Sequence, residues 1–439
     1  MIDYSCLKGK RVAFVTLGCK LNFAETSTLG ELLMSHGAVR AAKGERADIC
    51  IVNTCTVTSI ADSKCRQAIH RVIKENEGAL VAVTGCYAQL SAGLIERIDG
   101  VDVVVGAQQR GELIDQICYR LDGCNEKTVD GEGESTSQFF PSCSRGDRTR
   151  YFLKVQDGCN YFCTYCTIPM ARGRSRNGSI ASMVAQAQKV AEEGGREIVI
   201  TGVNIGDFGR TTGETFIDLI KALDRVEGIE RYRISSIEPN LLTDEIIDFC
   251  AQSRAFMPHF HIPLQSGSDD VLRLMHRHYD TALFRQRIEH IKRAMPDAFI
   301  GVDVMTGTRG ETQECFDRAY DFIESLDVSQ LHVFTYSERP GTKALLIPHS
   351  VSVADKHIRT QRLLQLSDMK TRNFYTRYIG HTARVLLEHT SPAKRIMHGF
   401  TENYIRVETD NRPELAGKIV TVRLDQFNTK QDALCASLQ

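Results

Sequence analysis

Short apolar runs rich in β-branched residues alternate with longer amphipathic stretches along most of this chain, and this alternation limits the folds that it can adopt. Continuous apolar strands separated by helices are typical of a parallel sheet that helices cover on both faces. Before residue 122, strands are expected at residues 11–17, 48–53, 80–84 and 101–105, and helices at 25–36, 59–75, 89–98 and 111–121. The sequence therefore predicts an α/β fold that starts with a doubly wound parallel sheet in residues 1–121.

The pattern then breaks and resumes. Residues 122–150 are rich in Gly, Ser and acidic residues without a clear period, which predicts a linker. Residues 151–376 contain six further strand-and-helix units, which predict a (β/α)6 partial barrel with its active face at the strand C-termini. Those strands are expected at 151–156, 197–201, 232–236, 259–263, 299–305 and 330–335.

The last part of the chain changes to a β pattern. A helix is expected at residues 354–377, and it precedes alternating segments at 381–389, 397–408 and 417–423. Such segments are consistent with a small β-barrel in residues 377–439. A chain of 439 residues is long enough for roughly three domains at about 150 residues each, which agrees with this division.

Composition bears mainly on the cysteines. No apolar run is long enough to cross a bilayer, and the N-terminus lacks a signal-peptide pattern, so we expect a cytoplasmic protein with no membrane partner. A reducing cytosol keeps thiols free for metals or catalysis, and the 15 cysteines cannot all be paired internally. Because 54 Lys and Arg balance 55 Asp and Glu, any nucleic-acid surface must be local.

The sharpest motif places Cys159, Cys163 and Cys166 within eight positions after a predicted strand. Three thiolates on one loop can hold three irons of a [4Fe–4S] cluster and leave the fourth iron open for a small molecule. A zinc site would usually need a fourth Cys or His at suitable spacing, and none is present here. The remaining alternative is three unconnected buried thiols.

A second set is dispersed, because Cys19, Cys55 and Cys86 each follow a different predicted strand of the first sheet. The C-terminal ends of parallel strands lie at one edge of a sheet, where ligands bind, so these cysteines can converge. The alternative is that each small thiol packs where a strand meets a helix. The remaining cysteines are expected to be core or surface thiols: 6, 50, 65, 118, 124, 143, 250, 315 and 435.

The C-x3-C-x2-C spacing, with the aromatic Tyr165 before its third cysteine, resembles the radical S-adenosylmethionine superfamily. The two cysteine sets in this order, followed by a β-rich tail, resemble the methylthiotransferases, which end in an RNA-binding TRAM domain. Further carriers of the resemblance are residues 171–176, 200–206, 233–239, 261–268 and 334–342. The resemblance implies two [4Fe–4S] clusters and two S-adenosylmethionine molecules per turnover, the second cluster carrying the sulfur on Cys19, Cys55 and Cys86.

Residues 17–22, 163–169 and 399–407 look most like the branch that inserts a methylthio group at carbon 2 of N6-threonylcarbamoyladenosine at position 37 of transfer RNA. The enzyme alternatives are methylthiolation of isopentenyladenosine-37 in transfer RNA or of a ribosomal-protein aspartate. A different class is a non-catalytic, metal-stabilised RNA-binding protein. One departure from the family pattern is Arg309, which stands where relatives usually have proline.

Binding residues are expected at strand ends. By resemblance, Tyr165, Gly202, Asn204, Ser236 and Glu238 are candidates for contacts to S-adenosylmethionine, although Gly, Asn and Ser also favour turns.

Arg172, Arg174 and Arg176 are candidates for contacts to RNA phosphates or to the S-adenosylmethionine carboxylate, and the alternative is a solvated basic loop. The aromatics Phe400 and Tyr404 are candidates for stacking on RNA bases, and the alternative for Tyr404 is the barrel core. Residues 351–400 add nine Lys and Arg against three acids, an excess of six, which is a candidate phosphate-contacting surface. The expected partners are a transfer RNA anticodon loop, a low-potential electron donor and a sulfur source.

Overall fold

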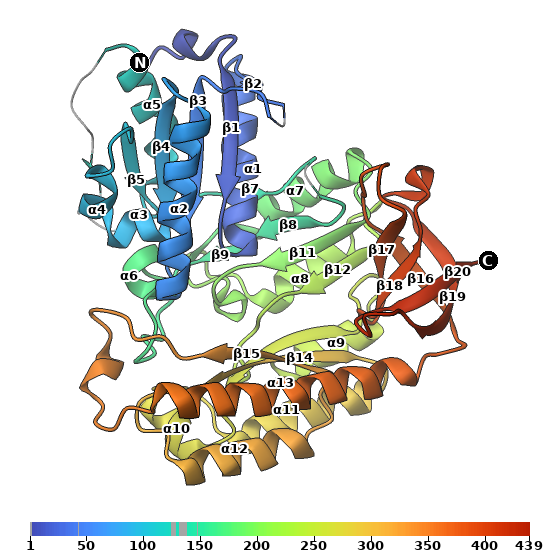
Figure 1. The fold of residues 1–439 in the computed structure, drawn as a ribbon. Helices are drawn as coiled ribbons and strands as arrows, with labels where there is room; N and C mark the ends of the chain where they lie inside the picture. Colours follow the sequence, from blue (N-terminus) through green and yellow to red (C-terminus); the bar gives the residue numbers. More distant parts are fainter. Residues whose placement is uncertain (1, 43, 124–128, 131–137, 147) are drawn as a thin grey trace. The chain divides into compact units, whose positions relative to one another are not determined.

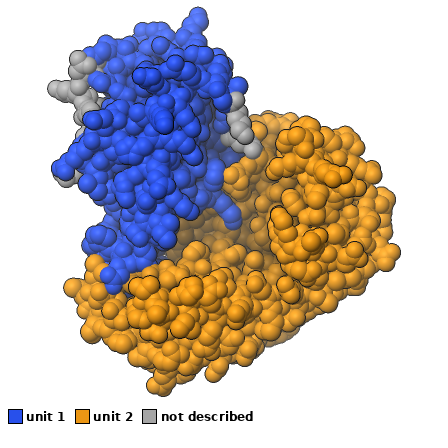
Figure 2. Space-filling model, in the orientation of Figure 1, with its two compact units in different colours: residues 1–145, 154–178, 337–342 blue, residues 146–153, 179–336, 343–439 orange. Residues whose placement is uncertain are grey.

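The computed structural model describes residues 2–42, 44–123, 129–130, 138–146 and 148–439. They form two compact units (Figure 2). Unit 1 comprises residues 1–145, 154–178 and 337–342, and unit 2 comprises residues 146–153, 179–336 and 343–439. Each unit is described by itself below. No helix in the described ranges is long and apolar enough to span a membrane.

Unit 1 is built on a parallel sheet with the strand order β2-β1-β3-β4-β5-β6 (Figure 1). Every neighbouring pair is parallel, as the continuous apolar runs predicted. The strands are β1 Arg11–Thr16, β2 Val39–Arg40, β3 Ile49–Thr54, β4 Leu80–Gly85, β5 Val103–Gly106 and β6 Val129–Asp130. The helices are α1 Lys20–Ser35, α2 Ser59–Glu75, α3 Cys86–Leu90, α4 Ala92–Glu96 and α5 Leu113–Leu121, with short 3-10 turns at Ser5–Leu7 and Arg110–Glu112.

Helices cover both faces of this sheet. Leu29 and Leu33 of α1 pack with Ile117 of α5 on one face. Ile69 and Val72 of α2 pack on the other. Because alternate residues of a strand point to opposite faces and both faces are covered, β3 and β4 are buried at every position. The predicted doubly wound sheet is confirmed.

Unit 1 also takes in a later stretch of the chain. It contains β7 Ser142–Cys143, β9 Gln156–Asp157, α6 Ile168–Arg172 and β10 Arg176–Asn177, the last antiparallel to β9. The described part of the predicted linker is therefore partly ordered, because β7 is buried beside α1. Cys143 N donates to Thr28 Oγ1 at 3.2 Å.

Unit 2 contains the predicted barrel strands. β11 Glu197–Thr201 pairs in parallel with β12 Arg231–Ile234, next to β8 Tyr151–Lys154. β13 His259–Gln265, β14 Phe299–Thr306 and β15 Gln330–Thr335 form a second parallel sheet, and single parallel bridges join β12 and its end to the segment around β13.

The helices between these strands are α7 Ile180–Glu192, α8 Phe216–Asp224, α9 Asp244–Gln252, α10 Asp269–Leu274, α11 Thr281–Ala294 and α12 Gln313–Ser325 (Figure 1). Hydroxyl or carboxylate N-caps begin most of them, as at Thr312, whose Oγ1 accepts from Cys315 N. The remaining short turns are Ile205–Asp207, Lys343–Leu346 and Pro413–Leu415.

The long helix α13 Val353–Thr376 leads into a closed barrel with the order β16-β17-β18-β20-β19. Its strands are β16 Thr382–Leu387, β17 Ile396–Thr401, β18 Arg406–Asp410, β19 Ile419–Phe427 and β20 Leu434–Leu438. The barrel is confirmed, with two differences. The predicted strand at 397–408 is broken by a turn in which Tyr404 has φ 64°, and β20 was not predicted.

Candidate functional site

The C-terminal edge of the unit 1 sheet carries the first cysteine set. Cys19 is the N-cap of α1, Cys55 directly follows β3, and Cys86 begins α3 directly after β4. Burial raises the pKa of the Cys55 thiol to about 12, and Cys86 and Cys19 lie close enough for their charges to add to that rise. The structure thus brings together the three cysteines that the strand pattern predicted to converge.

Two glycines allow this close approach. Gly18 has φ 105°, and a Cβ there would lie 2.8 Å from Cys55 Cβ. Gly85 has φ 103°, and a Cβ there would lie 2.4 Å from Thr54 O. Both positions need a residue without a side chain, because Gly18 lies against the Cys55 side chain and Gly85 lies against the Thr54 backbone.

A fourth thiol, Cys65 of α2, lies beside this set. Its Sγ accepts from Cys55 N at 3.3 Å and lies equally close to Cys55 O, and the side chain is fully buried. Cys65 packs in the core on the α2 face of the sheet with Ile69 and Val72, which agrees with its prediction as a core or surface thiol, and its contact with Cys55 is an addition to that role. The one sequence signal for this contact is that Cys65 lies on the apolar face of α2, which packs towards β3.

The second cysteine set lies on the loop between β9 and α6, also in unit 1. Cys163 is buried and Cys159 and Cys166 are partly exposed. Tyr161 N donates to Cys159 Sγ, and Ile168 N donates to Cys166 Sγ, each at 3.4 Å. Backbone N–H groups aimed at sulfur favour the thiolate and tune an iron–sulfur cluster, so the donors present fit such a group.

Tyr165, the aromatic residue of the cysteine motif, lies within this loop. It stands in a turn closed by a hydrogen bond from Cys166 N to Cys163 O at 3.0 Å.

Within the part of the chain that the structure describes, no three Cys, His, Asp or Glu side chains are grouped closely enough to hold a single metal ion.

The three arginines after this loop differ in their surroundings. Arg172 and Arg176 are 2% and 5% exposed and pair with Asp157. Arg174 is exposed, and its guanidinium lies 4.6 Å from the Phe162 ring centroid. Of the three, only Arg174 fits the picture of a solvated basic loop.

In unit 2, the candidate cofactor contacts follow β11 and β12. Gly202 is partly exposed, Asn204 is buried, and Ser236 makes a parallel bridge to His261. Glu238 pairs with Arg277. Burial raises the pKa of Glu238, and the Arg277 charge offsets part of that rise.

Two further polar residues of this barrel were not singled out from the sequence. His261 Nε2 lies 2.6 Å from Asp303 Oδ1, across β13 and β14. The signal that could have found Asp303 is its charge within the mostly apolar strand β14, where its register partner is Pro263, two residues after His261.

The basic excess of residues 351–400 is not one free surface. Arg359 pairs with Glu311 at 2.6 Å, Arg362 with Asp317 at 3.0 Å and Arg384 with Glu230 at 2.7 Å. Lys370 is buried and donates to backbone carbonyls. Exposed Lys394 and Arg395 instead line a cavity of about 390 Å³ on the barrel, together with His398, Arg406 and Lys430.

Phe400 and Tyr404 are engaged within unit 2. Their rings stack with centroids 4.7 Å apart, and the Arg150 guanidinium lies 4.5 Å from the Phe400 centroid. Arg150 also donates to Tyr404 Oη at 3.2 Å. These aromatics therefore join the barrel to the start of β8 rather than standing free.

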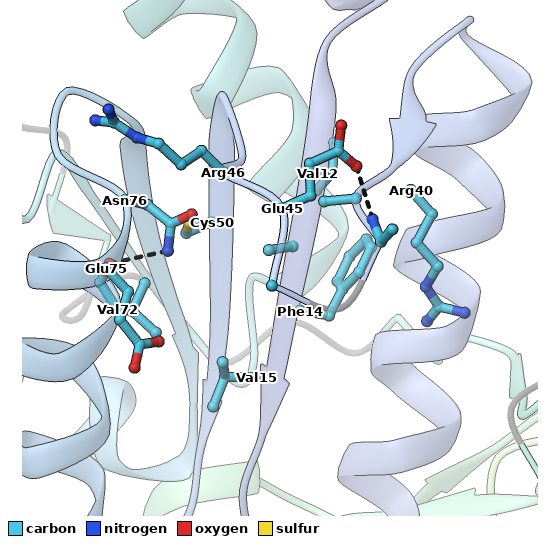
Figure 3. A pocket seen from close by; sticks show the side chains of 14 residues that line it. Val12, Phe14, Val15, Arg40, Glu45, Arg46, Cys50, Val72, Glu75 and Asn76 are labelled. Carbon is cyan, nitrogen blue, oxygen red and sulfur yellow. Dashed lines mark hydrogen bonds between the residues drawn. The ribbon is translucent and has the colours of Figure 1, made fainter. Parts of the chain in front are cut away.

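A separate cavity of about 540 Å³ lies beside β1 and the end of α2 (Figure 3). Apolar side chains such as Val15 and Val72 line it, with polar ones such as Arg46 and Asn76. None of the predicted site residues lines it, so this cavity does not contribute to either cysteine set.

Comparisons with known proteins match these two regions. The radical SAM superfamily model matches residues 153–323, and a model described as uncharacterized protein family UPF0004 matches residues 11–106. The threonylcarbamoyladenosine tRNA methylthiotransferase MtaB of Bacillus subtilis (strain 168) is 39% identical over 94% of this chain and 93% of its own length. The tRNA-2-methylthio-N(6)-dimethylallyladenosine synthase of Aliarcobacter butzleri (strain RM4018) is 32% identical over 94% and 96%.

Among solved structures, the radical S-adenosylmethionine methyltransferase TsrM from Kitasatospora setae, with cobalamin and a [4Fe–4S] cluster bound, superposes with a TM-score of 0.58. It is 15% identical, and the match covers 76% of this chain and 77% of that one. At that identity the likeness concerns the fold alone.

Proposed function

This chain belongs to the radical S-adenosylmethionine methylthiotransferase family, and on that premise we propose that it inserts a methylthio group at carbon 2 of N6-threonylcarbamoyladenosine-37 in transfer RNA. The observation that carries the proposal is the convergence of Cys19, Cys55 and Cys86 in the same unit as the Cys159 loop. The choice of base rests on the higher identity to the threonylcarbamoyladenosine relative, 39% against 32%.

The family implies one [4Fe–4S] cluster and S-adenosylmethionine. Bound to the Cys159 loop, they would supply a carbon radical. A radical is needed because carbon 2 of adenine carries an unactivated C–H bond. Cys159, Cys163 and Cys166 would hold that cluster. The backbone N–H groups of Tyr161 and Ile168 would favour the anionic form of Cys159 and Cys166.

The finer part of the proposal concerns the second cysteine set. Cys19, Cys55 and Cys86 would hold a second [4Fe–4S] cluster that carries the sulfur. Two S-adenosylmethionine molecules per turnover would then be needed, one to supply the methyl group and one the radical. Tyr165, Gly202, Asn204, Ser236 and Glu238 would contribute contacts to S-adenosylmethionine.

The partners follow from the same chemistry. A transfer RNA anticodon loop would meet phosphate-binding side chains, and the exposed pair Lys394 and Arg395 on the barrel is our candidate. Reduction of the cluster needs a low-potential electron donor, and replacing the transferred sulfur needs a sulfur source. We expect this activity in the cytoplasm, because a reducing compartment keeps cysteine thiols free to bind metals.

The first test is iron and sulfide analysis after anaerobic reconstitution. We expect about eight irons in the intact protein and about four in the Cys19→Ala, Cys55→Ala, Cys86→Ala triple variant. Cys250→Ala is the control, since Cys250 is a buried thiol of α9 outside both sets. About four irons in both the intact protein and the triple variant would reduce the proposal to a single-cluster radical enzyme.

The second test offers the reconstituted protein three substrates: transfer RNA with threonylcarbamoyladenosine, transfer RNA with isopentenyladenosine, and ribosomal protein. Mass spectrometry of the digested products should find the methylthio group on the first. Failure on every RNA would refute the proposed substrate class. A non-catalytic RNA-binding protein would show no reductive cleavage of S-adenosylmethionine at all.

A further inference from the structure

One buried guanidinium, that of Arg172, lies between the two cysteine sets within unit 1. Arg172 ends α6 and is 2% exposed. Its Nη2 donates to Asn22 Oδ1 at 2.7 Å, and its Nη1 donates to Asp157 Oδ1 at 2.9 Å. It also donates to both carboxylate oxygens of Glu25, at 2.9 and 3.2 Å.

The Asn22 end of this arrangement belongs to the first cysteine set. Asn22 Nδ2 donates to Leu17 O at 2.7 Å and to Thr54 O at 3.0 Å, so it holds the backbone just before Cys19 and Cys55. Cys19 Sγ lies 3.7 Å from Asn22 Oδ1. The amide therefore fixes two of the three strand ends to each other.

The Asp157 end belongs to the second set. Asp157 Oδ1 accepts from Gly158 N at 2.9 Å, directly before Cys159. Arg172 itself follows Cys166 by six residues. Ala171, its neighbour on α6, is buried against Cys86 of α3. Hydrogen bonds and packing thus connect both cysteine loops through the end of α6.

The charges around Arg172 are unequal. Arg110 and Lys154 lie 2.6 and 2.7 Å from Glu25 Oε1, and Lys154 and Arg176 lie 2.6 and 3.2 Å from Asp157 Oδ2. With Arg172, this cluster holds four buried cations around two carboxylates. Nε and Nη2 of Arg110 have no hydrogen-bond partner among the described residues. Buried charge without compensation is costly, and cysteines that ligate iron are anionic.

We propose that Arg172 is a positioning residue for both cysteine sets: its planar guanidinium fixes the Cys19 and Cys55 strand ends relative to the Cys159 loop. This inference rests on the proposed function, because it assumes a cluster on each set. A lysine could keep the charge, but its single ammonium cannot reproduce the fixed fork that reaches Asn22, Glu25 and Asp157 together. Arg110 supplies a matched control, because it contacts Glu25 and lacks the bridge between the loops.

The experiment compares reconstituted wild type, Arg172→Lys, Arg172→Gln and Arg110→Gln. Iron content and electron paramagnetic resonance of the reduced proteins report the two clusters and the magnetic interaction between them. In the resonance spectrum, we expect the lines that arise from the magnetic interaction between the two clusters to change in both Arg172 variants. The same lines should be unchanged in Arg110→Gln. We also expect methylthio product to fall about 100-fold in Arg172→Lys, while reductive cleavage of S-adenosylmethionine falls far less.

Each other outcome overturns the inference. If Arg172→Lys has the wild-type spectrum and product yield, the charge alone matters. If Arg110→Gln changes the spectrum as much as Arg172→Gln, the group of buried charged side chains acts only through its summed charge. Thermal melting of the apo proteins identifies a variant that does not fold, and Arg172→Lys keeps the buried charge for that case. Wild type with only about four irons would remove the proposed second cluster, and the inference with it.

Discussion

Glu25 is a carboxylate on α1 with no exposure to solvent, and its ionisation is tied to three cations. Burial by itself would raise its pKa, but the charges of Arg110, Arg172 and Lys154 outweigh this effect and lower the pKa to about 2. A carboxylate whose pKa is depressed by folding stabilises the native state above its ordinary pKa. That stabilisation is lost as the pH falls.

We therefore expect the apo protein to lose stability between pH 4.5 and about 2, in part because Glu25 is protonated there. Glu25→Gln should be about 3–5 kcal/mol less stable at pH 7, since it leaves buried cations without their partner, and its stability should fall less steeply over that acid window. Urea unfolding at a series of pH values measures both effects. Glu289→Gln, on the exposed face of α11, is the control. Parallel pH profiles for Glu25→Gln and wild type would contradict the expectation.

Arg309, the departure from the family pattern, has a structural role in unit 2. Its Nη1 donates to the carbonyls of Ile347 at 3.1 Å and Leu345 at 3.4 Å. Arg309→Ala should loosen this segment by about 1.5–3 kcal/mol, the usual effect of losing hydrogen bonds from a charged donor. Hydrogen exchange at residues 343–349 measures it, with exposed Arg293→Ala as the control. Unchanged exchange there would show that other contacts hold the segment.

At the scale of single residues, candidate site residues could be predicted where their spacing is local. Cys159, Cys163 and Cys166 could be found from their separation alone, and Cys19, Cys55 and Cys86 from their positions after strands. The Arg172 network could not be found in this way, because Arg172 and Glu25 are 147 residues apart and nothing local pairs them. The contact between Cys65 and the Cys55 backbone could not be found either, because the two residues belong to different elements.

Among the elements, the turn from β4 into α3 is the tightest part of the cysteine edge. Gly85→Ala would place a Cβ 2.4 Å from Thr54 O at positive φ, so we expect loss of iron from the first set as the strand end moves. Gly78→Ala is a matched control, because Gly78 also has positive φ but a Cβ there meets nothing within 4 Å. It should cost only about 1 kcal/mol of strain. Equal iron losses in the two variants would mean that backbone strain and not contact is responsible.

The elements that the sequence predicted well are those with a complete local pattern. β3 and β4 are buried on both faces, and the first four residues of each form an apolar run. β20 is short and mixed, and its place is set by β18 and β19, which pair with it on either side. The break between β17 and β18 depends on a positive φ at Tyr404, a backbone state that bulky residues rarely adopt.

For the whole molecule, the distribution of charge decides where RNA can bind. Lys394 and Arg395 are exposed on the barrel, whereas Arg362 pairs with Asp317. We expect Lys394→Ala, Arg395→Ala to weaken transfer RNA binding and to reduce the dependence of log K on log salt by about two. Arg362→Ala should change that slope by less than about one. Binding titrations at several salt concentrations measure the slopes, and an unchanged slope in the double variant would exclude this surface.

Unit 1 combines segments that are far apart in the sequence, and this affects the order in which its contacts can form during synthesis. Two partners of Glu25 are synthesised long after it: Lys154 follows by 129 residues and Arg172 by 147 residues. At about 5–20 residues per second, a ribosome needs roughly 7–30 s to add that stretch. Of the three cation partners of Glu25, Arg110 is the one synthesised before Lys154, so during most of this time the carboxylate lacks part of the charge that compensates its burial. Ala171 of α6, which packs against Cys86, is synthesised at the end of the same interval, so Cys86 cannot be fully covered until that interval has passed.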